Sequence, residues 1–466
     1  MNFESDTICA IATAMSDAGI GIIRVSGPDA ISICDKVYIN AAHKHTLRDH
    51  KSHTIKFGYL CDLQENILDE IMISVMKAPH TYTKEDVVEV NTHGGKFIMN
   101  KALELLLSAG CRIAEPGEFT KRAFLNGRID LTKAEAVMDI ISAQNEFALK
   151  SSEKQLSGFL FDEIADLRKK LIYEMAFIES ALDDPENYDL DGYGERLTKV
   201  IDSVSTKLNS LISSADEGII RKDGISTVII GKPNSGKSSL LNNLAGQERA
   251  IVTDIAGTTR DIIEETIKID DIVLHVIDTA GIRNTDDVIE KIGVDKAKTY
   301  AKDAELIIYI IDSTSDLNED DFEILDLIKD KKTIVLLNKS DLDSDIINEE
   351  ILYNKYNLDK NIPIIRTSML NNDGIDNLKK SISDLFFNGD IAPKEELYIT
   401  NLRHKDALIN SLESLKLVQD SIDNGMSEDF YAVDLMNAYT FLGNIIGAEV
   451  GEDLVEEIFS KFCMGK

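Results

Sequence analysis

The chain has 466 residues, a length that accommodates about three domains of roughly 150 residues each. Apolar residues make up 43% of it, enough for hydrophobic cores, but no uncharged apolar run approaches the ~18 residues that a membrane-spanning helix needs. The net charge of −32 argues against non-specific binding to nucleic acid or anionic lipid, so an RNA partner would have to meet a local basic patch or be held by another protein.

The N-terminus and the cysteines indicate a cytoplasmic protein. The first residues, Met1–Asp6, lack the basic segment with which a signal peptide begins, so none is expected. The cysteines are odd in number and scattered, which fits a reducing compartment better than a disulfide framework. They are Cys9, Cys34, Cys61, Cys111 and Cys463.

The first part of the chain, residues 1–121, is predicted to form a separate mixed α/β domain. Short apolar runs, one of which alternates with period two, predict its strands. These cover Thr7–Ala12, Gly19–Val25, Ile55–Leu60, Glu70–Met76 and Val87–Val90. The last run leads into Thr92–Gly95, which we interpret as a turn that opens a helix over Lys96–Leu107.

Four histidines lie in one short polar stretch, at positions 43, 45, 50 and 53. They could be read as metal ligands, but the stretch holds no cysteine and is rich in lysine. We therefore interpret it as a solvated loop.

From Thr132 onward the pattern becomes helical, and residues 122–222 are expected to form the first part of a helical domain. Thr132–Glu135 reads as a capping box, which predicts a helix start. Apolar residues then recur at steps of three and four from Leu160 to Ile178, the stripe of a helix that packs in a bundle. The acidic run Asp183–Asp189 is interpreted as a loop, and another helix is expected over about 194–216.

The stretch Gly231–Ser238 reads Gly-Lys-Pro-Asn-Ser-Gly-Lys-Ser, the phosphate-cradling loop of nucleotide hydrolases. An apolar strand, Thr227–Ile230, precedes it and a helical stretch follows it, which is the required context. Backbone N–H groups and the helix dipole suit an anion at this point, and the Lys237 ammonium can reach the outer phosphates. Ser238 is placed to hold Mg²⁺.

Two motifs further along would hold the metal and the γ-phosphate. Gly257–Asp261 supplies Thr259 as a second ligand for Mg²⁺. Asp278–Gly281 ends an apolar strand and would place its carboxylate near Mg²⁺ and its glycine at the γ-phosphate.

Two more motifs select the base. Asn338–Asp341 follows the strand Thr333–Leu337, and the Asp341 carboxylate can accept hydrogen bonds from N1–H and the amino group of guanine, a donor pair that adenine lacks. Thr367–Met369 would close over the base. Five motifs in this order predict a GTPase. The residues expected to contact GTP are Asn234, Ser235, Gly236, Lys237, Ser238, Ser239, Thr253, Asp254, Ile255, Ala256, Gly257, Thr258, Thr259, Asp278, Thr279, Ala280, Gly281, Asn338, Lys339, Asp341, Ser368 and Met369.

The catalytic machinery differs from that of many GTPases, in which a glutamine after this Asp-Thr-Ala-Gly run positions the attacking water. Here the position is Ile282, which cannot form hydrogen bonds. Arg260, Arg283 and Glu290 are the candidates to replace that glutamine. Asn234 offers an amide oxygen to a K⁺ ion, which could supply the positive charge that an arginine finger supplies in other GTPases. The alternative role of Asn234 is to stabilise the loop, and one residue can fill both roles.

Further short motifs are spread along the chain, at Asp6–Ile8, Gly21–Gly27, Tyr82–Asp86, His93–Gly95, Pro116–Thr120, Arg122–Arg128, Ala134–Ala136 and Phe462–Lys466. With these motifs the chain resembles, along essentially its whole length, the MnmE (TrmE) family of bacterial tRNA-modification GTPases. The resemblance implies a tetrahydrofolate-binding N-terminal domain that dimerises, a discontinuous helical domain (122–222 and 386–466) and an inserted α/β GTPase domain of the phosphate-loop class (223–385).

The resemblance also implies the partners and the site residues. The homodimer would act with the FAD-dependent protein MnmG, as a heterotetramer, to install an aminomethyl-type group on the wobble uridine of certain tRNAs. The folate derivative would contact Arg24, Glu89, Arg128 and Lys466, and K⁺ would lie at Asn234, Thr253, Ile255 and Thr258. Glu290 would position the water. Cys463 is either a reactive thiol near the C-terminus or a buried structural cysteine.

The chain departs from the family pattern at a few positions. Ala14–Ala18 replaces a turn that is usually rich in proline and glycine, and Lys84 stands where glycine is common. Met369 replaces a small residue after Ser368, and Met464 is a mild change in the C-terminal motif.

Two alternatives of other classes remain. A GTPase that assists ribosome assembly would need a basic RNA-binding module, and no basic tail with a Gly-x-x-Gly loop is present. A membrane-remodelling GTPase would need a lipid-binding loop or a basic amphipathic helix, against which the net charge of −32 weighs.

Overall fold

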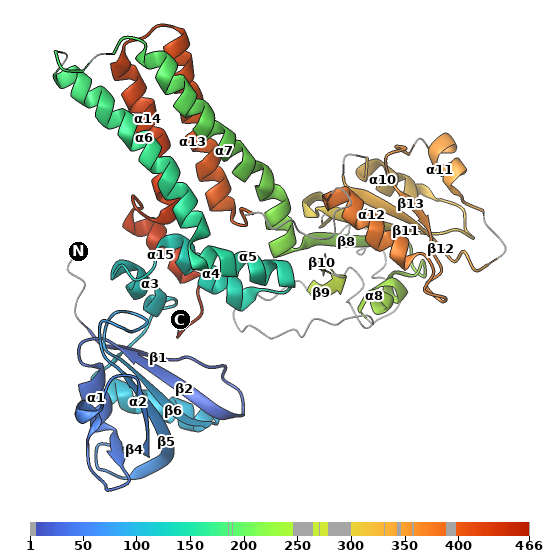
Figure 1. Ribbon diagram of the computed structural model, residues 1–466. Helices are drawn as coiled ribbons and strands as arrows, with labels where there is room; N and C mark the ends of the chain where they lie inside the picture. Colours follow the sequence, from blue (N-terminus) through green and yellow to red (C-terminus); the bar gives the residue numbers. More distant parts are fainter. Residues whose placement is uncertain are drawn as a thin grey trace. The chain divides into compact units, whose positions relative to one another are not determined.

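The structure is a computed structural model that describes residues 6–184, 186–188, 190–245, 264–269, 271–277, 300–329, 331–342, 346–356, 358–387 and 398–465 (Figure 1). The chain divides into two compact units, each built from segments that are far apart in the sequence. The first unit comprises Met1–Met138, Gln155–Gly194 and Glu413–Lys466, and the second comprises Asp139–Lys154 and Glu195–Leu412. Within the described ranges, no helix combines the length and the apolar character that crossing a membrane requires.

The N-terminal part of the first unit contains a seven-stranded sheet among the described residues, in the order β3-β4-β5-β6-β2-β1-β7. All neighbouring strands are antiparallel except β1 and β7, which pair in parallel. The strands are β1 (Ile8–Ile11), β2 (Ala18–Ser26), β3 (Tyr38–Asn40), β4 (Thr54–Cys61), β5 (Ile67–Met76), β6 (Val87–Gly94) and β7 (Arg112–Ile113).

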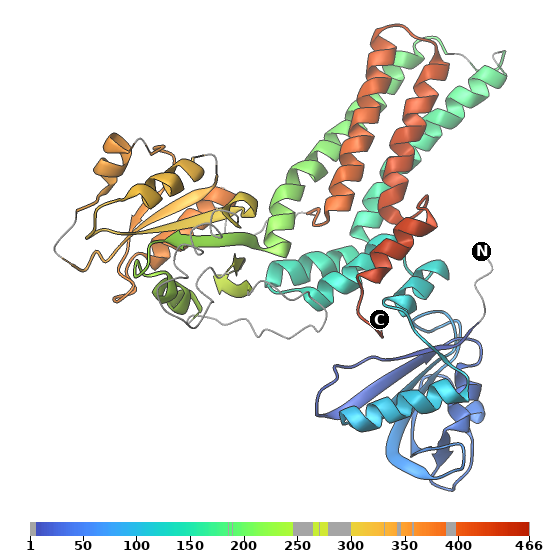
Figure 2. The same cartoon turned by 180° about the vertical axis from the view of Figure 1, so that it is seen from behind.

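One face of this sheet is covered by helices α1 (Ala30–Lys36) and α2 (Lys96–Ala109), as Figures 1 and 2 show. Alternate strand residues such as Ile23, Val25 and Val90 point toward these helices and are fully buried. The opposite face carries Arg24 and Glu89, which lie directly opposite each other on β2 and β6. A single-turn 3₁₀ helix, Leu47–Asp49, lies in the connection between β3 and β4.

Two local predictions for the first unit are wrong. Thr92–Gly94 is not a turn, because β6 stays paired with β2 as far as Gly94 opposite Ala18, and helix α2 begins at Lys96. Thr132 does not cap a helix, because α4 (Leu131–Ser142) has already begun. The cap is Asp130, whose carboxylate accepts hydrogen bonds from the Lys133 N–H at 3.0 Å and from the Thr132 hydroxyl.

The rest of the first unit is helical. The predicted apolar stripe is confirmed in α6 (Phe159–Asp183), in which the residues from Leu160 to Ile178 that were expected to face a core are buried. Helix α6 packs side by side with α14 (Glu428–Ile446), although about half of the chain separates them (Figures 1 and 2). Helices α3 (Glu118–Leu125) and α15 (Glu452–Ser460) also lie next to each other.

The second unit is built on a six-stranded sheet, counted over the described residues, in the order β13-β12-β11-β8-β10-β9. It is parallel except for the edge strand β9, which runs antiparallel to β10. The strands are β8 (Ile225–Gly231), β9 (Glu264–Ile269), β10 (Ile272–Ile277), β11 (Leu306–Asp312), β12 (Thr333–Asn338) and β13 (Ile364–Arg366). The near-continuous apolar runs of the central strands β8, β11 and β12 reflect burial on both faces.

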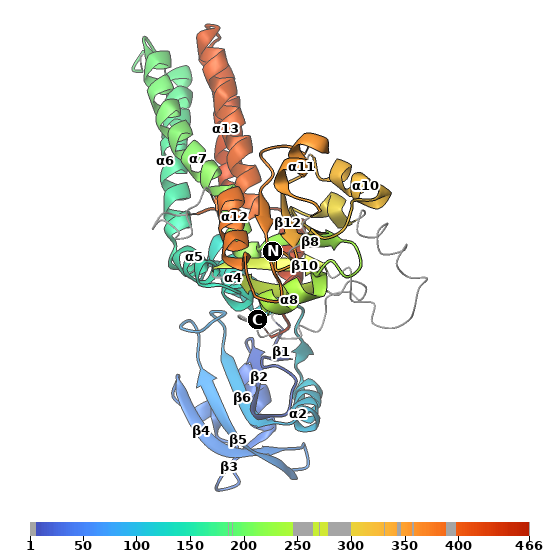
Figure 3. The ribbon, with the colours of Figure 1, turned by 90° about the vertical axis from the view of Figure 1, so that its right-hand side faces the viewer.

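Both faces of this sheet are covered by helices. One face packs against α8 (Lys237–Ala245) and α12 (Ile375–Phe387), and the other against α10 (Glu319–Leu327) and α11 (Glu349–Lys355). Figure 3 shows α10 and α11 together, apart from α8. The unit also contains α5 (Glu146–Ser157, in part), α7 (Tyr193–Asp223, from Glu195) and the first half of α13 (Leu402–Asp423).

Candidate functional site: a phosphate loop and a separate charged site

The parallel strands of the second unit all end at one edge of the sheet, and the predicted nucleotide-binding residues follow them there. The glycine-rich loop follows β8, Asn338 ends β12, and Thr367–Met369 comes directly after β13. In open α/β sheets, ligands bind outside the carboxyl ends of the strands. The structure therefore brings the described phosphate-loop and base-selecting residues together at the edge where a nucleotide would bind.

The loop around Ser235 is shaped for a close approach of main-chain atoms. Gly231 has no room for a side chain, since a Cβ atom there would lie 2.4 Å from the Ile310 carbonyl oxygen. Gly236 has a φ of +110°, and its Cβ would lie 2.1 Å from Nδ2 of Asn338. Asn234 also has a positive φ, +59°, a conformation that asparagine tolerates better than most residues. Such tight turns, with residues of positive φ, are typical of loops whose N–H groups bind anions.

Two polar side chains of the loop mark where a phosphate would be bound. The Lys237 Nζ donates hydrogen bonds of 2.7 Å to the carbonyl oxygens of Gly231 and Lys232, so the ammonium lies across the mouth of the loop. The Ser235 hydroxyl is buried and has no hydrogen-bond partner among the described residues. Ser238 and Ser239 are exposed in the first turn of α8, next to the positive end of its dipole.

Asn338 connects the phosphate loop to the segment expected to close over the base. Its Nδ2 donates to the Ser235 carbonyl oxygen at 2.7 Å, and its Oδ1 accepts from the Met369 N–H at 3.2 Å. The side chain is buried, so losing either partner would leave an unsatisfied polar group. A single amide thus fixes the distance between the phosphate-binding and base-binding ends of the site.

The carboxylate of Asp341 is held in place by Ser368, whose hydroxyl donates to it at 2.7 Å. Asp341 itself is exposed, as a residue that contacts a base must be. Its neighbour Lys339, with a φ of +68°, forms a 2.6 Å ion pair with Asp312 at the end of β11. Burial alone would raise the pKa of Asp312, but hydrogen bonds from Lys339 and Thr314 outweigh it and lower that pKa.

Met369 contributes its main chain to this site and its side chain to the core. The side chain is buried in the cluster between the sheet and α8 and α12, and the carbonyl oxygen accepts a 2.8 Å hydrogen bond from Asn243. A large residue is accommodated where a small one is usual because its side chain is buried in this cluster, beside Gly236 of the phosphate loop.

Many of the predicted site residues lie outside the described residues, and the structure places none of them. These are Thr253, Asp254, Ile255, Ala256, Gly257, Thr258, Thr259, Arg260, Asp278, Thr279, Ala280, Gly281, Ile282, Arg283, Glu290 and Lys466.

Three of the four residues predicted to contact folate, Arg24, Glu89 and Arg128, come together in the first unit. The Arg24 guanidinium donates to Glu89 through Nε at 3.0 Å and through a terminal nitrogen at 2.9 Å. Its other terminal nitrogen donates to the Gly465 carbonyl oxygen at 3.1 Å, so the C-terminal segment ends at this cross-strand pair. Gly465 can approach because its φ is +86° and any Cβ would collide with the Ile11 carbonyl oxygen. Arg24 is therefore half of an ion pair and not a free cation.

Tyr82 links Arg24 to Arg128. The Arg24 guanidinium lies 5.6 Å from the centre of the Tyr82 ring, and the Arg128 guanidinium lies 4.8 Å from it. The Tyr82 hydroxyl forms a 2.9 Å hydrogen bond with Thr120 of α3, which fixes the ring between the two cations.

A charge network holds the loop that carries Tyr82. Arg122 of α3 pairs with Asp6, Glu85 and Glu118, and Glu118 also pairs with Arg112 at 2.6 Å. Burial alone would raise the pKa of Glu118, but hydrogen bonds from Arg112, the Glu115 N–H and Arg122 lower it. The network joins segments up to 116 residues apart, so it fixes the N-terminal edge of this site.

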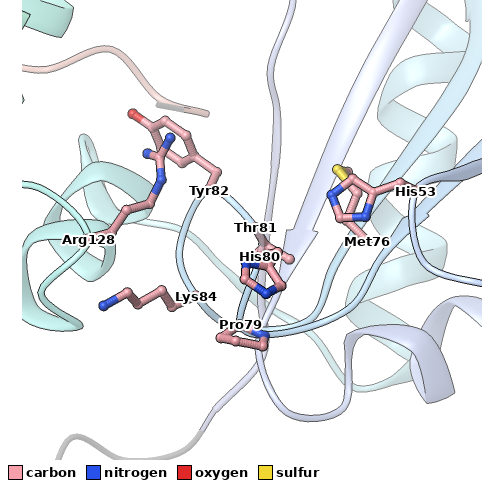
Figure 4. Close-up of a pocket in the computed structure, with 8 residues that line it drawn as sticks. All are labelled: His53, Met76, Pro79, His80, Thr81, Tyr82, Lys84 and Arg128. Atoms are coloured by element: carbon pink, nitrogen blue, oxygen red, sulfur yellow. The ribbon is translucent and has the colours of Figure 1, made fainter. Parts of the chain in front are cut away.

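A cavity of about 490 Å³ opens beside Arg128 and Tyr82 (Figure 4). Lys84 and His80 also line it. Lys84 has a φ of +61°, a conformation that favours glycine, and its Nζ donates to the carbonyl oxygens of Asn126 and Gly127 at 2.9 and 3.0 Å. At a position where glycine is usual, the lysine thus connects its own loop to the turn at Asn126 and Gly127.

The four histidines of the predicted loop have separate neighbours. His43 stacks on Tyr59, His45 contacts the Asp35 carbonyl oxygen, His50 meets the ring of Tyr38 edge-on, and His53 is bonded to Ser52. Over the part of the chain that the structure describes, no three metal-ligating side chains are grouped.

Cys463 is exposed, so of its two possible roles the buried structural one is wrong. Its carbonyl oxygen accepts from the Gly117 N–H at 3.3 Å, which holds the C-terminal segment beside α3.

Sequence reasoning missed several residues that shape these sites. Asp312 is a lone acid at the end of an apolar strand, a position that could have marked it as a site residue. The stretch that carries the family resemblance includes Tyr82 and Lys84, and His80 lies next to it. These residues line one cavity only in the folded chain, so no local sequence pattern indicates the cavity.

Comparison with known proteins agrees with this arrangement. A family model described as the GTP-binding protein TrmE N-terminus matches residues 7–128, and one described as the MnmE helical domain matches residues 131–463. The chain is 52% identical to the tRNA modification GTPase MnmE of Lachnoclostridium phytofermentans over 463 residues, which cover 99% of this chain and 100% of the relative. The chain belongs to the MnmE family.

Other MnmE proteins match over the same extent. Those of Clostridioides difficile and Acetivibrio thermocellus are 46% and 45% identical, each over 465 residues and the full length of both chains. Among solved structures, Era of Aquifex aeolicus bound to GDP·AlF4⁻ is 30% identical and covers 41% of this chain and 67% of its own, with a TM-score of 0.27. That score is too low to bear on function. The N-terminal domain, the helical domain and the phosphate-loop α/β domain are thus those of an MnmE protein.

Proposed function

We propose that this MnmE-family chain is a potassium-activated GTPase that acts in tRNA modification. With an FAD-dependent partner, it adds a carboxymethylaminomethyl or aminomethyl group at C5 of the wobble uridine of certain tRNAs, using a one-carbon unit carried by tetrahydrofolate. The working form is a cytoplasmic homodimer that joins the FAD-dependent protein in a heterotetramer.

The observation that carries the GTPase assignment is the position of Asn338. One buried amide binds both the phosphate loop and the segment after β13, and three residues further on Asp341 presents a carboxylate that can accept from guanine. Full-length identity of 45–52% to proteins named tRNA modification GTPases supports the extension to tRNA.

The residues present fit the proposed ions. The mouth of the phosphate loop offers the exposed hydroxyl of Ser238 to Mg²⁺, and Thr259 would complete that pair. Asn234 is exposed, and its amide oxygen would ligate K⁺ together with Thr253, Ile255 and Thr258. Bound there, a monovalent cation supplies positive charge near the developing negative charge of the transition state, and Glu290 would orient the water.

The ion pair of Arg24 with Glu89 fits the pterin end of a folate. Glu89 keeps lone pairs that can accept from pterin N–H groups, and the adjoining Arg128 and Lys466 would meet the carboxylates at the other end. Arg24 also binds the carbonyl oxygen of Gly465. Cys463 is only two residues away from Gly465 in the sequence, so its thiol would lie near the proposed folate site.

Nucleoside analysis of tRNA from cells that lack the protein tests the proposed function. Wobble-uridine modification should disappear, return with the wild-type chain and stay absent with Lys237→Ala, which removes the ammonium at the mouth of the phosphate loop. An unchanged nucleoside profile in the deletion strain would contradict the proposal.

Potassium dependence is tested on the purified protein. GTP turnover should be about tenfold or more faster in K⁺ than in Na⁺, because the cation stabilises transition-state charge. Asn234→Ala should lose this difference while still binding GTP. Asn234→Gly, which suits the φ of +59°, should lose it as well and thereby separates the missing amide from backbone strain. A K⁺ response that survives both changes would rule out Asn234 as a ligand.

A further inference from the structure

Apart from Tyr82 itself, the charged and titratable side chains that line the cavity beside Tyr82 are all basic. Its lining includes His53, His80, Lys84 and Arg128, and no aspartate or glutamate lines it. Its volume of about 490 Å³ lies within the range of small-molecule sites. In a chain with a net charge of −32, a cavity lined by cations without carboxylates is a local exception.

The two permanent cations of this wall keep their charge available. Lys84 donates to the neutral carbonyl oxygens of Asn126 and Gly127, and Arg128 lies against the Tyr82 ring (Figure 4). Among the described residues, neither forms an ion pair with a carboxylate. The acids closest to Lys84 in sequence are occupied elsewhere, since Glu85 binds Arg122 and Asp86 accepts from the Ala78 N–H. The acid closest to Arg128, Asp130, pairs with Lys133.

The cavity adjoins the proposed folate site through a single ring. Tyr82 lies within 5.6 Å of the Arg24 guanidinium, which pairs with Glu89, and within 4.8 Å of Arg128 on the cavity wall. A ligand whose polar ring system meets Glu89 can therefore pass along Tyr82 and place its other end in the cavity.

We propose that this cavity binds the γ-linked glutamate chain of a polyglutamylated folate, an inference that rests on the proposed folate site. Each added glutamate brings one more carboxylate, and Arg128, Lys84, His80 and His53 can receive them in turn. The protein is thereby selective for folates that carry several glutamates over those that carry one.

Calorimetry on the full-length protein tests this selectivity. The probes are 5-formyltetrahydrofolate with one glutamate and the same compound with five. The pentaglutamate should bind about tenfold more tightly, because several partly exposed charge pairs are added, and the ratio should shrink as salt is raised.

Two variants assign the selectivity to this cavity. Lys84→Gly removes one charge and suits the φ of +61°, and His80→Gln removes a ring that no other described contact uses. Both changes together should bring the ratio of the two affinities to about threefold or less. The matched control is Lys101→Gln on the outer face of α2, where the lysine forms only an exposed pair with Glu104, and it should leave the ratio unchanged.

The possible outcomes separate this inference from the proposed function. Equal binding of both compounds would overturn the glutamate-chain site and leave the folate site standing. No binding of either would overturn the folate site and this inference with it. A preference that survives Lys84→Gly with His80→Gln would overturn the assignment to this cavity. Loss of tRNA affinity in that double variant, without a glutamate preference in the wild type, would make the cavity an RNA contact and overturn the inference.

Discussion

At the carboxyl edge of the six-stranded sheet, the contacts that shape the nucleotide site are made largely by main-chain atoms and amides, such as Asn338 to the Ser235 carbonyl oxygen. In the N-terminal domain, the contacts that shape the proposed folate site are made by charged side chains, such as Arg24 with Glu89 and Arg122 with Glu118. A main-chain site depends on which backbone conformations are sterically possible, whereas a charged site depends on protonation. The nucleotide site should therefore be sensitive to substitutions that change the backbone conformation, and the charged site to changes of charge and pH.

The largest effect is expected where the backbone conformation is changed. Gly236→Ala should lower GTP turnover by about 100-fold or more, because a Cβ would lie 2.1 Å from Nδ2 of Asn338 and the φ of +110° is unsuitable for alanine. The measurement is steady-state turnover together with nucleotide binding. Gly425→Ala is the matched control, since that glycine also has a positive φ, +64°, but faces open space. Near-normal turnover in Gly236→Ala would show that the loop tolerates a different path.

The next effect is expected in the charged region and depends on pH. Glu118→Gln should destabilise the first unit by about 2 kcal/mol at pH 7, since it weakens hydrogen bonds to two arginines. The pKa of Glu118 is lowered by the fold, so its stabilisation is fully present above the ordinary value of 4.5 and is lost as pH falls through the lower folded value. The melting temperatures of wild type and variant should therefore converge below pH 4.5.

The control for this pH dependence is Glu146→Gln, which removes an exposed pair with Lys150 and should not change the melting temperature measurably. If the difference in melting temperature between the wild type and Glu118→Gln stayed constant down to acid pH, packing and not charge would hold this region together.

A smaller effect is expected from a charged pair that braces the nucleotide edge, Lys339 with Asp312. Asp312→Asn weakens the ion pair with Lys339 and should raise the KM for GTP about fivefold, with little change in kcat, because hydrogen bonds to charged groups contribute about 1 kcal/mol when they are partly exposed. Asp326→Asn, which removes the exposed pair with Lys329, is the control. A fall in kcat alone would place Asp312 in the chemistry and weaken the contrast between the regions.

The contrast also explains what could be predicted from the sequence. The phosphate loop, its strand and its helix were predicted because a main-chain site needs glycines at fixed spacing, and this spacing can be read directly from the sequence. The strands around it were predicted from apolar runs, with β12 observed one residue longer than expected, at Thr333–Asn338. These features depend on neighbours in the sequence.

The charged region could not be predicted in the same way. Arg122 and Asp6 are 116 residues apart, so no local pattern indicates their pairing. The wrong capping box at Thr132 has a different, local cause, because Asp130 offered a better acceptor two residues earlier. The cavity beside Tyr82 needs a loop that begins at Pro79 and a turn at Gly127 to meet, which only the folded chain provides.

The most direct test of the account is the nucleotide selectivity of Asp341. Hydrolysis of GTP, ATP and xanthosine triphosphate is measured for the wild type and for Asp341→Asn, which can donate to the additional carbonyl of xanthine. We expect the wild type to hydrolyse GTP and not ATP, and the variant to lose GTP turnover and gain turnover of xanthosine triphosphate, because Ser368 holds this side chain toward the base. Equal turnover of GTP and ATP by the wild type, or unchanged GTP turnover in the variant, would contradict the guanine site on which the account is built.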